Sequence, residues 1–470
     1  MIVEIKPYTG YKDSGQAWLG EIPAHWYMGP GFSAFRKKHV KNTGMQEKTV
    51  LSLSYGRIVV KPPEKLHGLV PSSFETYQIV EPGDIIIRST DLQNDWNSLR
   101  IGLVKNRGII TSAYICLKTT EKLRPEYGYL VLHSFDLMKV FYGMGSGLRQ
   151  NLDFSDFKRM PVFIPPLDEQ AAIVRFLDHA NWRLDKAIRA KRKLIALLNE
   201  QKQAIIHRAV TRGLDPNVPM REMGNNLLAK IPIHWEIVAL RRYWEVVDCK
   251  HLTVPFVNEG IPLASVVEVQ SFSLDLSRCK KTTLNWYRVL IEGGRKPKQG
   301  NLIYCRNASV GAAALVDTDI DFAMGQDVCL IRSITQNQRF LNYVLHSPFM
   351  SHQLELILVG STFKRINISD IKALAVIVPP KIEQDNICEY LDKELQRFNE
   401  IINRTEREIS LLREYKTRLT ADVVTGKLDV REAARSLPEE SGEPETLDEV
   451  ETSDVEDDDE DLNLESNGEA

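Results

Sequence analysis

The chain has 470 residues, of which 43% are hydrophobic and 26% are charged, and its formal net charge is −3. A chain of this length is expected to form two or three domains with apolar cores. It has no run of about 18 apolar residues and no basic segment leading into an apolar one at its N-terminus, so we expect a soluble cytoplasmic protein that is neither exported nor membrane-bound.

Charge is distributed unevenly along the chain. Residues 438–470 hold 16 Asp and Glu and no Lys or Arg, which leaves 60 Lys and Arg against 47 Asp and Glu elsewhere, a formal charge of +13. A positive charge of this size on residues 1–437 favours a polyanionic partner. Solvated lysines on a large enzyme would give a milder version of the same imbalance. We expect residues 429–470 to form an acidic disordered tail that aids solubility, and the alternative is a regulatory mimic of DNA charge.

The six cysteines are scattered, with no C-x-x-C motif and no metal-type clustering with histidine. This pattern favours buried free thiols in a reducing cytoplasm, and we expect no metal site.

In chain order, an N-terminal segment (1–21) precedes a mixed domain over residues 22–164. Strands are predicted in "GDIIIRST" (83–90), a short β-rich run that follows a turn glycine, and in the similar run "TSAYICLK" (111–118). A long helix follows over residues 165–213. It begins at a proline pair, carries Asp168 and Glu169 in its first turn and ends at Gly213.

The second half repeats this order. A linker (214–230) leads to a second mixed domain (231–378), with strands predicted in "GNLIYCRN" (300–307) and "GQDVCLIR" (325–332), and then to a second long helix (379–428). Each helix of about 40 residues would be roughly 60 Å long. The predicted fold class is therefore α+β, with two globular mixed domains that are each followed by a long helix.

Self-comparison exposes an internal repeat. Residues 147–215 align with 361–429 at a constant offset of 214, and the phrase P-P-x-x-E-Q occurs in "IPPLDEQ" (164–170) and again in "VPPKIEQ" (378–384). Earlier, "GEIPAHW" (20–26) matches "AKIPIHW" (229–235) at an offset of 209. Between these anchors the two copies share little sequence. Each half is thus a constant frame around a variable insert.

Both long helices carry an apolar stripe at steps of three and four residues, which cannot stay in water. We predict that the two helices pair as an antiparallel coiled coil and that a pseudo-twofold axis relates the halves. The alternative is that each helix packs only on its own domain. The stripe residues singled out for this pairing, or for subunit docking, are Ile173, Leu177, Leu184, Leu198, Ile387, Leu391, Phe398 and Leu412.

Familiar catalytic motifs are missing from the sequence. There is no [D/N/S]-P-P-aromatic loop of an adenine methyltransferase and no G-x-x-x-x-G-K-[S/T] phosphate loop. "SDFK" (155–158) and "SDIK" (369–372) fit helix caps better than nuclease motifs. His25 and His234, each followed by Trp, are expected to pack at or cap the entrance of each domain. An enzyme acting alone is therefore poorly supported, and no catalytic residue is predicted.

The chain resembles the specificity subunit of type I restriction-modification enzymes. The resemblance is carried by "YKDSGQAWLGEIPAHW" (11–26), the doubled P-P-x-x-E-Q phrase, and two variable inserts that each precede a long helix. It covers nearly all of residues 8–430 and leaves the acidic tail outside.

This resemblance implies that each insert is a target recognition domain for one half of a bipartite, gapped double-stranded DNA sequence, and that the paired helices set the gap. It implies two methylation subunits that bring S-adenosylmethionine to an adenine in each half-site, and two restriction or motor subunits that use ATP and magnesium. The chain itself would bind no cofactor and catalyse nothing. The alternative is a two-module DNA-binding or interaction protein with a coiled-coil spacer.

Candidate DNA-binding residues are basic or amide side chains in loops, because Arg suits guanine edges and Asn or Gln suits adenine edges. Contact with phosphate, or plain solvation, is the alternative for each. The candidates are Arg57, Arg88, Asn94, Arg107, Arg149 and Gln150 in the first insert, and Arg306, Asn307, Gln326, Lys364 and Arg365 in the second.

Overall fold

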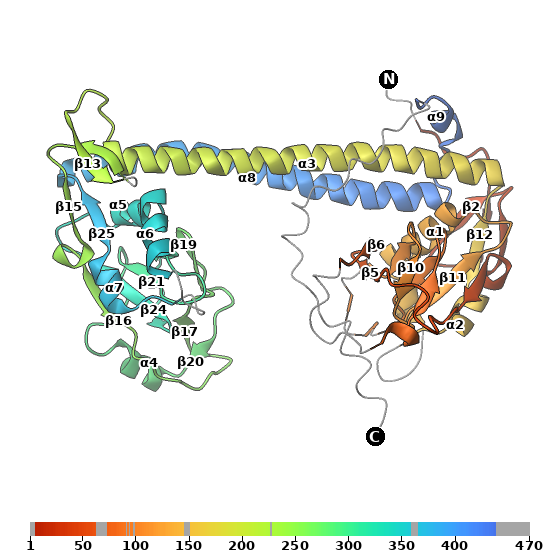
Figure 1. Cartoon of the computed structure of the whole chain (residues 1–470), viewed down its shortest axis with the longest axis horizontal. Helices are drawn as coiled ribbons and strands as arrows, with labels where there is room; N and C mark the ends of the chain where they lie inside the picture. Colours follow the sequence, from red (N-terminus) through yellow and green to blue (C-terminus); the bar gives the residue numbers. More distant parts are fainter. Residues whose placement is uncertain are drawn as a thin grey trace. The chain divides into compact units, whose positions relative to one another are not determined.

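The computed structural model describes residues 5–62, 73–90, 92–93, 95–96, 99–144, 151–225, 228–358 and 365–438. The chain folds into two compact units, Met1–Ala190 with Glu408–Ala470, and Lys191–Arg407. Two long helices, α3 (Leu167–Arg212) and α8 (Lys381–Val424), contribute to both units (Figure 1). Among the described helices, none combines the length and the apolar character needed to cross a membrane.

The first unit is built on an antiparallel sheet with the strand order β4-β11-β8-β9. Its strands are β4 (Phe35–Lys38), β8 (Ile85–Ile87), β9 (Ile101–Leu103) and β11 (Ile115–Thr119). The three isoleucines of β8 are fully buried, as expected for a β-branched run in a central strand. The helices beside the sheet are α1 (Pro125–Leu137) and α2 (Phe154–Arg159).

Four antiparallel strand pairs surround this sheet. They join β1 (Tyr11–Asp13) to β2 (Glu21–Pro23), β3 (Tyr27–Pro30) to β12 (Pro161–Ile164), β5 (Leu51–Ser54) to β6 (Arg57–Val60), and β7 (Gln78–Val80) to β10 (Gly108–Ile110). The pair β3–β12 closes the domain, because it brings the strand after the "IPAHW" entrance beside the strand before the proline pair.

The second unit is built on an antiparallel sheet with the order β16-β24-β21-β22. Its strands are β16 (Glu245–Asp248), β21 (Leu302–Cys305), β22 (Ala313–Leu315) and β24 (Val328–Arg332). In both units the order of the four strands, counted along the chain, is first, fourth, second, third. The two inserts therefore share a topology although they share little sequence.

Further elements of the second unit lie around this sheet. The strand pairs are β13 (Met220–Asn225) with β14 (Leu228–Pro232), β15 (Glu236–Ala239) with β25 (Ala375–Val378), and β18 (Val269–Gln270) with β19 (Ser273–Leu274). A small sheet has the order β20 (Lys281–Thr282), β17 (Ile261–Ala264), β23 (Ala323–Met324). The helices are α4 (Leu284–Ile291), α5 (Gln338–Leu345), α6 (Pro348–Leu358) and α7 (Ile368–Ala373).

The mixed α+β organisation, the four predicted strand runs and the two long helices are confirmed, with helix bounds a few residues inside those predicted. The "SDFK" and "SDIK" segments open α2 and α7, where Asp156 and Asp370 complete capping boxes with Asp153 and Asn367. These aspartates therefore bind helix N-termini.

Two predicted boundaries are corrected. The linker predicted over 214–230 contains most of the β13–β14 hairpin, whose pairing the local sequence did not reveal. The tail predicted from residue 429 begins instead with a short helix, α9 (Arg431–Arg435), in which Ala433 and Ala434 are buried, and Asp429 pairs with Lys6 in a β-bridge. Residues 439–470, the rest of that tail, lie outside the described residues.

Candidate nucleic-acid interface

The glutamate of the first repeated phrase anchors the tryptophan at the entrance of its domain. Glu169 lies in the first turn of α3, and its side chain is 2% exposed. Its Oε1 accepts a hydrogen bond of 2.8 Å from Trp26 Nε1, and its Oε2 lies 2.8 Å from His25 Nε2. Tyr8 also donates to this carboxylate, and burial together with that hydrogen bond raises the pKa of Tyr8 well above its ordinary value. The phenol is therefore a stable donor.

The second repeated phrase makes the same anchor. Glu383 Oε2 accepts a hydrogen bond of 2.9 Å from Trp235 Nε1, and Glu383 Oε1 lies 2.6 Å from His234 Nε2. Its side chain is 37% exposed, in contrast to that of Glu169. The expectation that the two His-Trp pairs pack at the domain entrances is confirmed, since both tryptophans are buried.

The glutamine of each phrase fastens the start of a domain helix. Gln170 Nε2 donates to Lys122 O and Pro165 O at 2.9 Å each, and its Oε1 accepts from Arg124 N, at the start of α1, at 2.8 Å.

Gln384 repeats the arrangement, donating to Pro379 O at 2.8 Å and accepting from Asn337 N, at the start of α5, at 2.9 Å. Each P-P-x-x-E-Q phrase thus ties a long helix rigidly to its own domain.

The candidate residues of the first insert lie on three different elements. Arg57 is in β6 and is exposed, Arg88 follows β8 with its Nη1 3.7 Å from Asp95 Oδ2, and Arg107 lies between β9 and β10 with its Nε 3.4 Å from Glu47 Oε2. The candidates Asn94, Arg149 and Gln150 lie outside the described residues.

The candidate residues of the second insert are gathered around Asp327. Arg365 Nη2 lies 3.2 Å from Asp327 Oδ1, and Asn307 Nδ2 donates to Asp327 Oδ2 at 3.3 Å. Asn307 and Arg365 also form a β-bridge, and Gln326 precedes Asp327 in the chain. Asn307 and Arg365 therefore form one cluster on Asp327. Gln326 adjoins it along the chain, with its side chain donating to Thr253 Oγ1 at 3.2 Å. Lys364 lies outside the described residues.

Arg306 stands apart from this cluster because it is buried, with 5% of its surface exposed. Its guanidinium donates to Asp248 and to Ile366 O. A side chain engaged in this way does not extend to a base edge, so its position does not suit the predicted base-reading role.

The acidic partners Asp248 and Asp327 were missed by sequence reasoning, which searched for basic and amide residues. Their positions could have indicated them, because Asp248 is the last residue of β16 and Asp327 immediately precedes β24. The buried Arg100 was missed as well, since arginine is ordinarily solvated and nothing local marks a buried one.

Asp248, Cys249 and His251 form a possible metal-binding group, with one donor atom from each within 4.8 Å of the others. The Arg306 guanidinium contacts both Asp248 and His251. Positive charge is therefore already supplied to this group by the protein, and burial raises the pKa of the Cys249 thiol, which disfavours the thiolate that binds metals.

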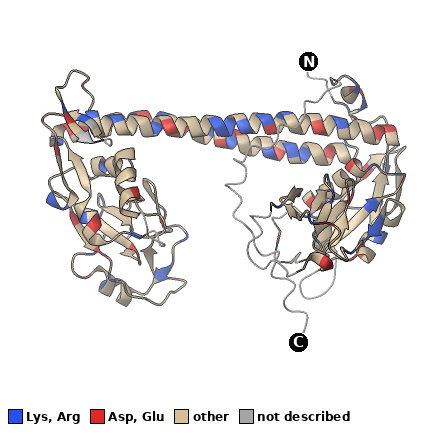
Figure 2. Cartoon of the chain, in the orientation of Figure 1, with Lys and Arg blue, Asp and Glu red and all other residues tan. Residues whose placement is uncertain are grey.

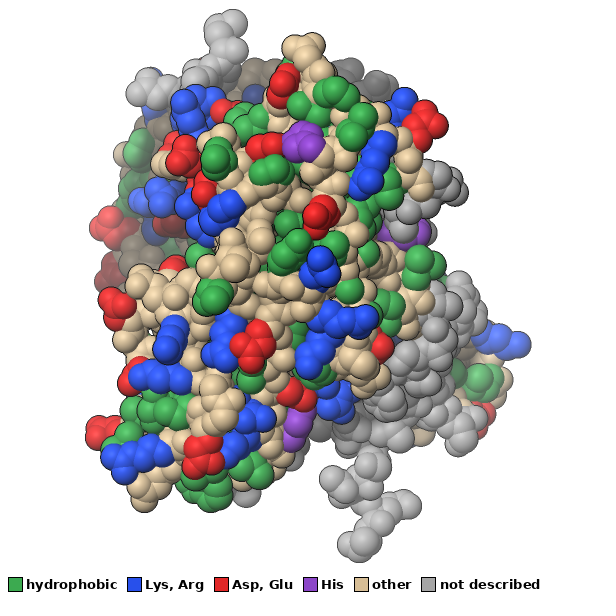
Figure 3. Space-filling view, turned by 90° about the vertical axis from the view of Figure 1, so that its left-hand side faces the viewer, with side chains coloured by type: hydrophobic (Ala, Val, Ile, Leu, Met, Phe, Trp, Pro, Cys, Tyr) green, Lys and Arg blue, Asp and Glu red, His purple; other side chains and the backbone are tan. Residues whose placement is uncertain are grey.

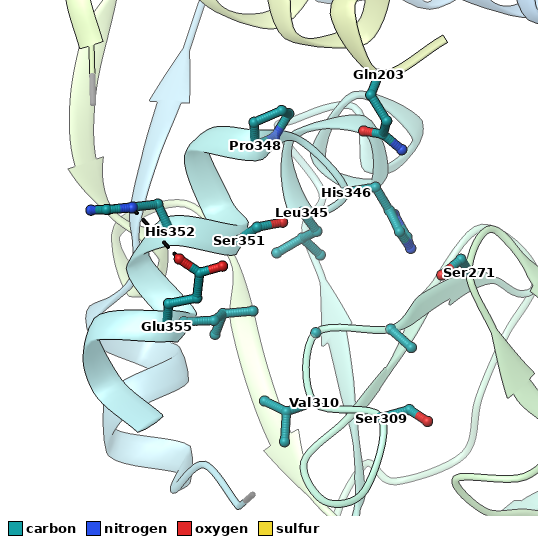
Figure 4. A pocket seen from close by; sticks show the side chains of 13 residues that line it. Gln203, Ser271, Ser309, Val310, Leu345, His346, Pro348, Ser351, His352 and Glu355 are labelled. Carbon is teal, nitrogen blue, oxygen red and sulfur yellow. Dashed lines mark ion pairs between the residues drawn. The ribbon is translucent and has the colours of Figure 1, made fainter. Parts of the chain in front are cut away.

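A cavity of about 640 Å³ opens in the second unit (Figure 4). It is lined by polar side chains that include Gln203, Ser271 and Ser351, and by His346. His346 stacks on Phe272 at 3.9 Å, and burial lowers its pKa. Among the described residues its ring nitrogens face Asn342 O and Ala313 N, so this histidine does not activate a serine of the cavity.

Basic residues are widely distributed. Figure 2 shows Lys and Arg along both long helices and on the loops of both units. On the face of the second unit seen in Figure 3, they are interspersed with Asp and Glu. Positive charge is therefore distributed over several elements of each unit.

The stripe residues of the long helices fall into two groups. Ile173 and Leu177 belong to the core of the first unit, and Ile387 and Leu391 to that of the second, where all four are buried. The partly buried members are Leu184, Leu198, Phe398 and Leu412. The ends of each helix thus pack into domain cores.

The chain is similar in sequence to specificity subunits of type I restriction enzymes. The chain is 22% identical over 364 residues to the type I restriction enzyme MjaVIII specificity subunit of Methanocaldococcus jannaschii, covering 74% of this chain and 81% of that protein. It is 20% identical to the putative type I restriction enzyme MjaX specificity subunit of the same organism, covering 88% and 96%.

The chain shares its fold with a solved structure from a study of the structural basis underlying complex assembly and conformational transition of the type I R-M system. The TM-score is 0.63 at 16% sequence identity, over 87% of this chain and 99% of that one. A family model described as the type I restriction modification DNA specificity domain matches residues 40–200 and 250–411, which include most of both inserts. Since this match covers more than half of the sequence, the chain belongs to the type I restriction-modification DNA specificity family.

Proposed function

We propose that this chain selects the DNA sequence on which a type I restriction-modification complex acts, with each unit recognising one half of a bipartite, gapped target. The observation that carries the proposal is the doubled architecture. Two domains, whose central sheets have the same strand order but dissimilar residues, are each bonded to a long helix by the same Glu and Gln. A constant frame with variable inserts suits a reader of two different half-sites.

We infer that α3 and α8 pair as an antiparallel coiled coil and that a pseudo-twofold axis relates the two halves. In the first unit Lys416 Nζ donates to Asp185 Oδ1 at 2.6 Å, and in the second Lys202 Nζ donates to Asn399 Oδ1 at 2.6 Å. Between these contacts the residue number rises by 17 along α3 and falls by 17 along α8, as antiparallel helices require.

The stripe of α8 supports this pairing. Buried or partly buried residues alternate at steps of four and three, the heptad spacing of a coiled coil. They are Leu391, Leu395, Phe398, Ile402, Thr405, Ile409 and Leu412. A helix of 46 residues would be about 69 Å long, enough to separate two domains by the 34–36 Å or so of one DNA turn.

Affinity for DNA and selection of its sequence would depend on different side chains of this chain. Basic side chains would supply salt-dependent affinity for phosphates, while Asn307, Gln326 and Arg365 would contact base edges in the major groove. We propose that methylation of adenine, with S-adenosylmethionine, and cleavage, with ATP and magnesium, belong to two methylation and two restriction subunits in the cytoplasm. The chain itself would be non-catalytic.

The test is a methylome of a host that expresses the chain with its cognate methylation subunit. One bipartite, gapped adenine motif is expected, and it should vanish when this chain is deleted. A methylome that deletion leaves unchanged would contradict the proposal.

A further inference from the structure

Two arginines are buried among the described residues, one in each unit, and they flank the loop of the corresponding hairpin from opposite sides. Arg306 directly follows β21 and is 5% exposed, and Arg100 directly precedes β9 and is 0% exposed. Both lie at the end of the hairpin that joins the second and third strands, β8–β9 or β21–β22. Removing a guanidinium from water is costly, so a compensating role is expected.

Arg306 joins three segments of the second unit. Its Nη1 donates to the carboxylate of Asp248 at the end of β16, and its Nε donates to Ile366 O at 3.4 Å. Its main-chain N donates to Asp327 O at 2.8 Å, and its O accepts from Ile366 N at 2.9 Å. The neighbours of these contact points are Asn307, Gln326 and Arg365. Arg306 therefore lies behind the cluster proposed to contact bases.

The backbone around Arg306 is strained in the way typical of functional sites. His251, Ala308 and Asp327 have φ angles of 49°, 56° and 63°, in the left-handed region that L side chains seldom adopt. Such conformations persist only where surrounding contacts fix them. Arg306 is bonded to His251 and Asp327 and lies two residues from Ala308, so its contacts help to hold all three.

Arg100 does the equivalent work in the first unit through main-chain carbonyls. Its Nη1 donates to Thr90 O at 2.6 Å and its Nη2 to Asp95 O at 2.7 Å, while its Nε donates to Tyr142 Oη at 3.2 Å. Trp96, which is exposed, stacks on Tyr142 with ring centroids 4.4 Å apart. Arg100 thus holds the main chain after β8 at Thr90 and Asp95, and its Nη1 also donates to the carbonyl of the candidate Arg88 at 3.4 Å.

We propose that Arg100 and Arg306 are positioning residues for DNA recognition that do not touch a base. Arg306 would fix the segments that carry Asn307, Gln326 and Arg365, and Arg100 would fix the main chain beside the candidate Arg88. The inference deepens the proposed function and rests on it. Its consequence is specific, since loss of one arginine should relax only the half-site read by the same unit.

The test compares Arg100→Lys and Arg306→Lys in the full complex. Lysine keeps the charge and the length but loses the planar fork that reaches several acceptors at once. Methylomes of hosts carrying each complex would be scored for methylation at sites with one mismatch in either half. We expect methylation at mismatched sites to rise about tenfold in one half only, and in opposite halves for the two variants. Arg288→Lys, at an exposed position on α4, is the matched control and should leave both halves unchanged.

Thermal unfolding of each complex checks that it is assembled. If a lysine variant does not assemble, two milder variants take its place. Asp248→Asn removes the negative charge that faces Arg306, and Tyr142→Phe removes the hydroxyl that accepts from Arg100 Nε and donates to Asp95 O. Each should give the same half-site relaxation as the arginine variant of its own unit. Equal relaxation of both halves, or no relaxation in a folded complex, would overturn the inference. A wild-type complex with no bipartite motif would instead overturn the proposed function itself.

Discussion

The carboxylate of Glu169 lies 2.8 Å from the indole Nε1 of Trp26, although 143 residues separate the two in the chain. Glu383 and Trp235 repeat the contact at 2.9 Å across 148 residues. The doubled P-P-x-x-E-Q phrase is therefore the point at which each long helix is bonded to the entrance of its own domain. The two copies differ in their surroundings, which makes them a matched pair for experiment.

Replacing Glu169 with Ala should destabilise the protein more than replacing Glu383 with Ala. The first change leaves two buried donors, Trp26 Nε1 and Tyr8 Oη, without their acceptor, and each such loss costs about 1–3 kcal/mol. At Glu383, which is 37% exposed, water can replace part of what is lost.

Urea-induced unfolding of the full chain measures the difference. Asp168→Ala, one residue earlier on α3 and exposed, is the control and should have a small effect. A larger loss of stability for Glu383→Ala than for Glu169→Ala would show that burial does not decide the strength of the anchor.

The stability of the first unit should fall as the pH is lowered from about 7 to about 4. Burial, and then the charge of Lys416, lower the pKa of His133 from its ordinary value of 6.5 to about 4. In this range the unfolded chain binds a proton that the folded chain does not, so the free energy of unfolding decreases as the pH falls.

His133→Gln should flatten this dependence, measured as the difference in free energy of unfolding between about pH 7 and about pH 5. His39→Gln, at an exposed position, should keep the dependence of the wild type. The same pH dependence in His133→Gln and in the wild type would exclude His133 as its source.

Asn307→Ala and Gln326→Ala should change which bases are preferred without changing the salt dependence of DNA binding. A well-placed amide contact discriminates against a wrong base by about 1–3 kcal/mol, whereas counterion release depends on charged contacts with phosphate. Affinities of the complex for single-base variants of its target, taken at several salt concentrations, separate the two effects. A changed salt slope with an unchanged base preference would assign these residues to the phosphate backbone.

Truncation after Pro438 should leave the fold intact and strengthen nonspecific DNA binding. It removes 16 acidic residues and keeps α9, as well as the hydrogen bonds from Arg175 Nη2 to Leu437 O and Pro438 O at 2.8 and 3.1 Å. Truncation at residue 429 should lower stability as well, because it removes the buried Val430, Ala433 and Ala434. Weaker nonspecific binding after the shorter truncation would contradict a repulsive role for the acidic segment.

Local patterns in the sequence predicted the regular elements well. Alternation of apolar residues at three and four steps, the proline pairs and Gly213 located α3 and α8, because helix periodicity and termination depend on near neighbours. The β13–β14 hairpin was missed, since "MREMGN" has little strand character by itself and becomes a strand through its pairing with residues 228–232. Of the candidate site, the grouping of Asn307 and Arg365 was not predictable, because the two side chains come from distant segments and meet at Asp327.

The sequence by itself determined the repeated frame, the two long helices and the family, since these reside in spacing and in the order of short phrases along the chain. Only the tertiary structure decided that the glutamate of the first P-P-x-x-E-Q phrase is buried while that of the second is partly exposed, and which arginines lie at the surface. Glu169 is enclosed by Tyr8, which lies 161 residues away, and Arg306 is buried against Asp248, 58 residues away. Burial depends on which distant segments meet, and no local pattern of residues records that meeting.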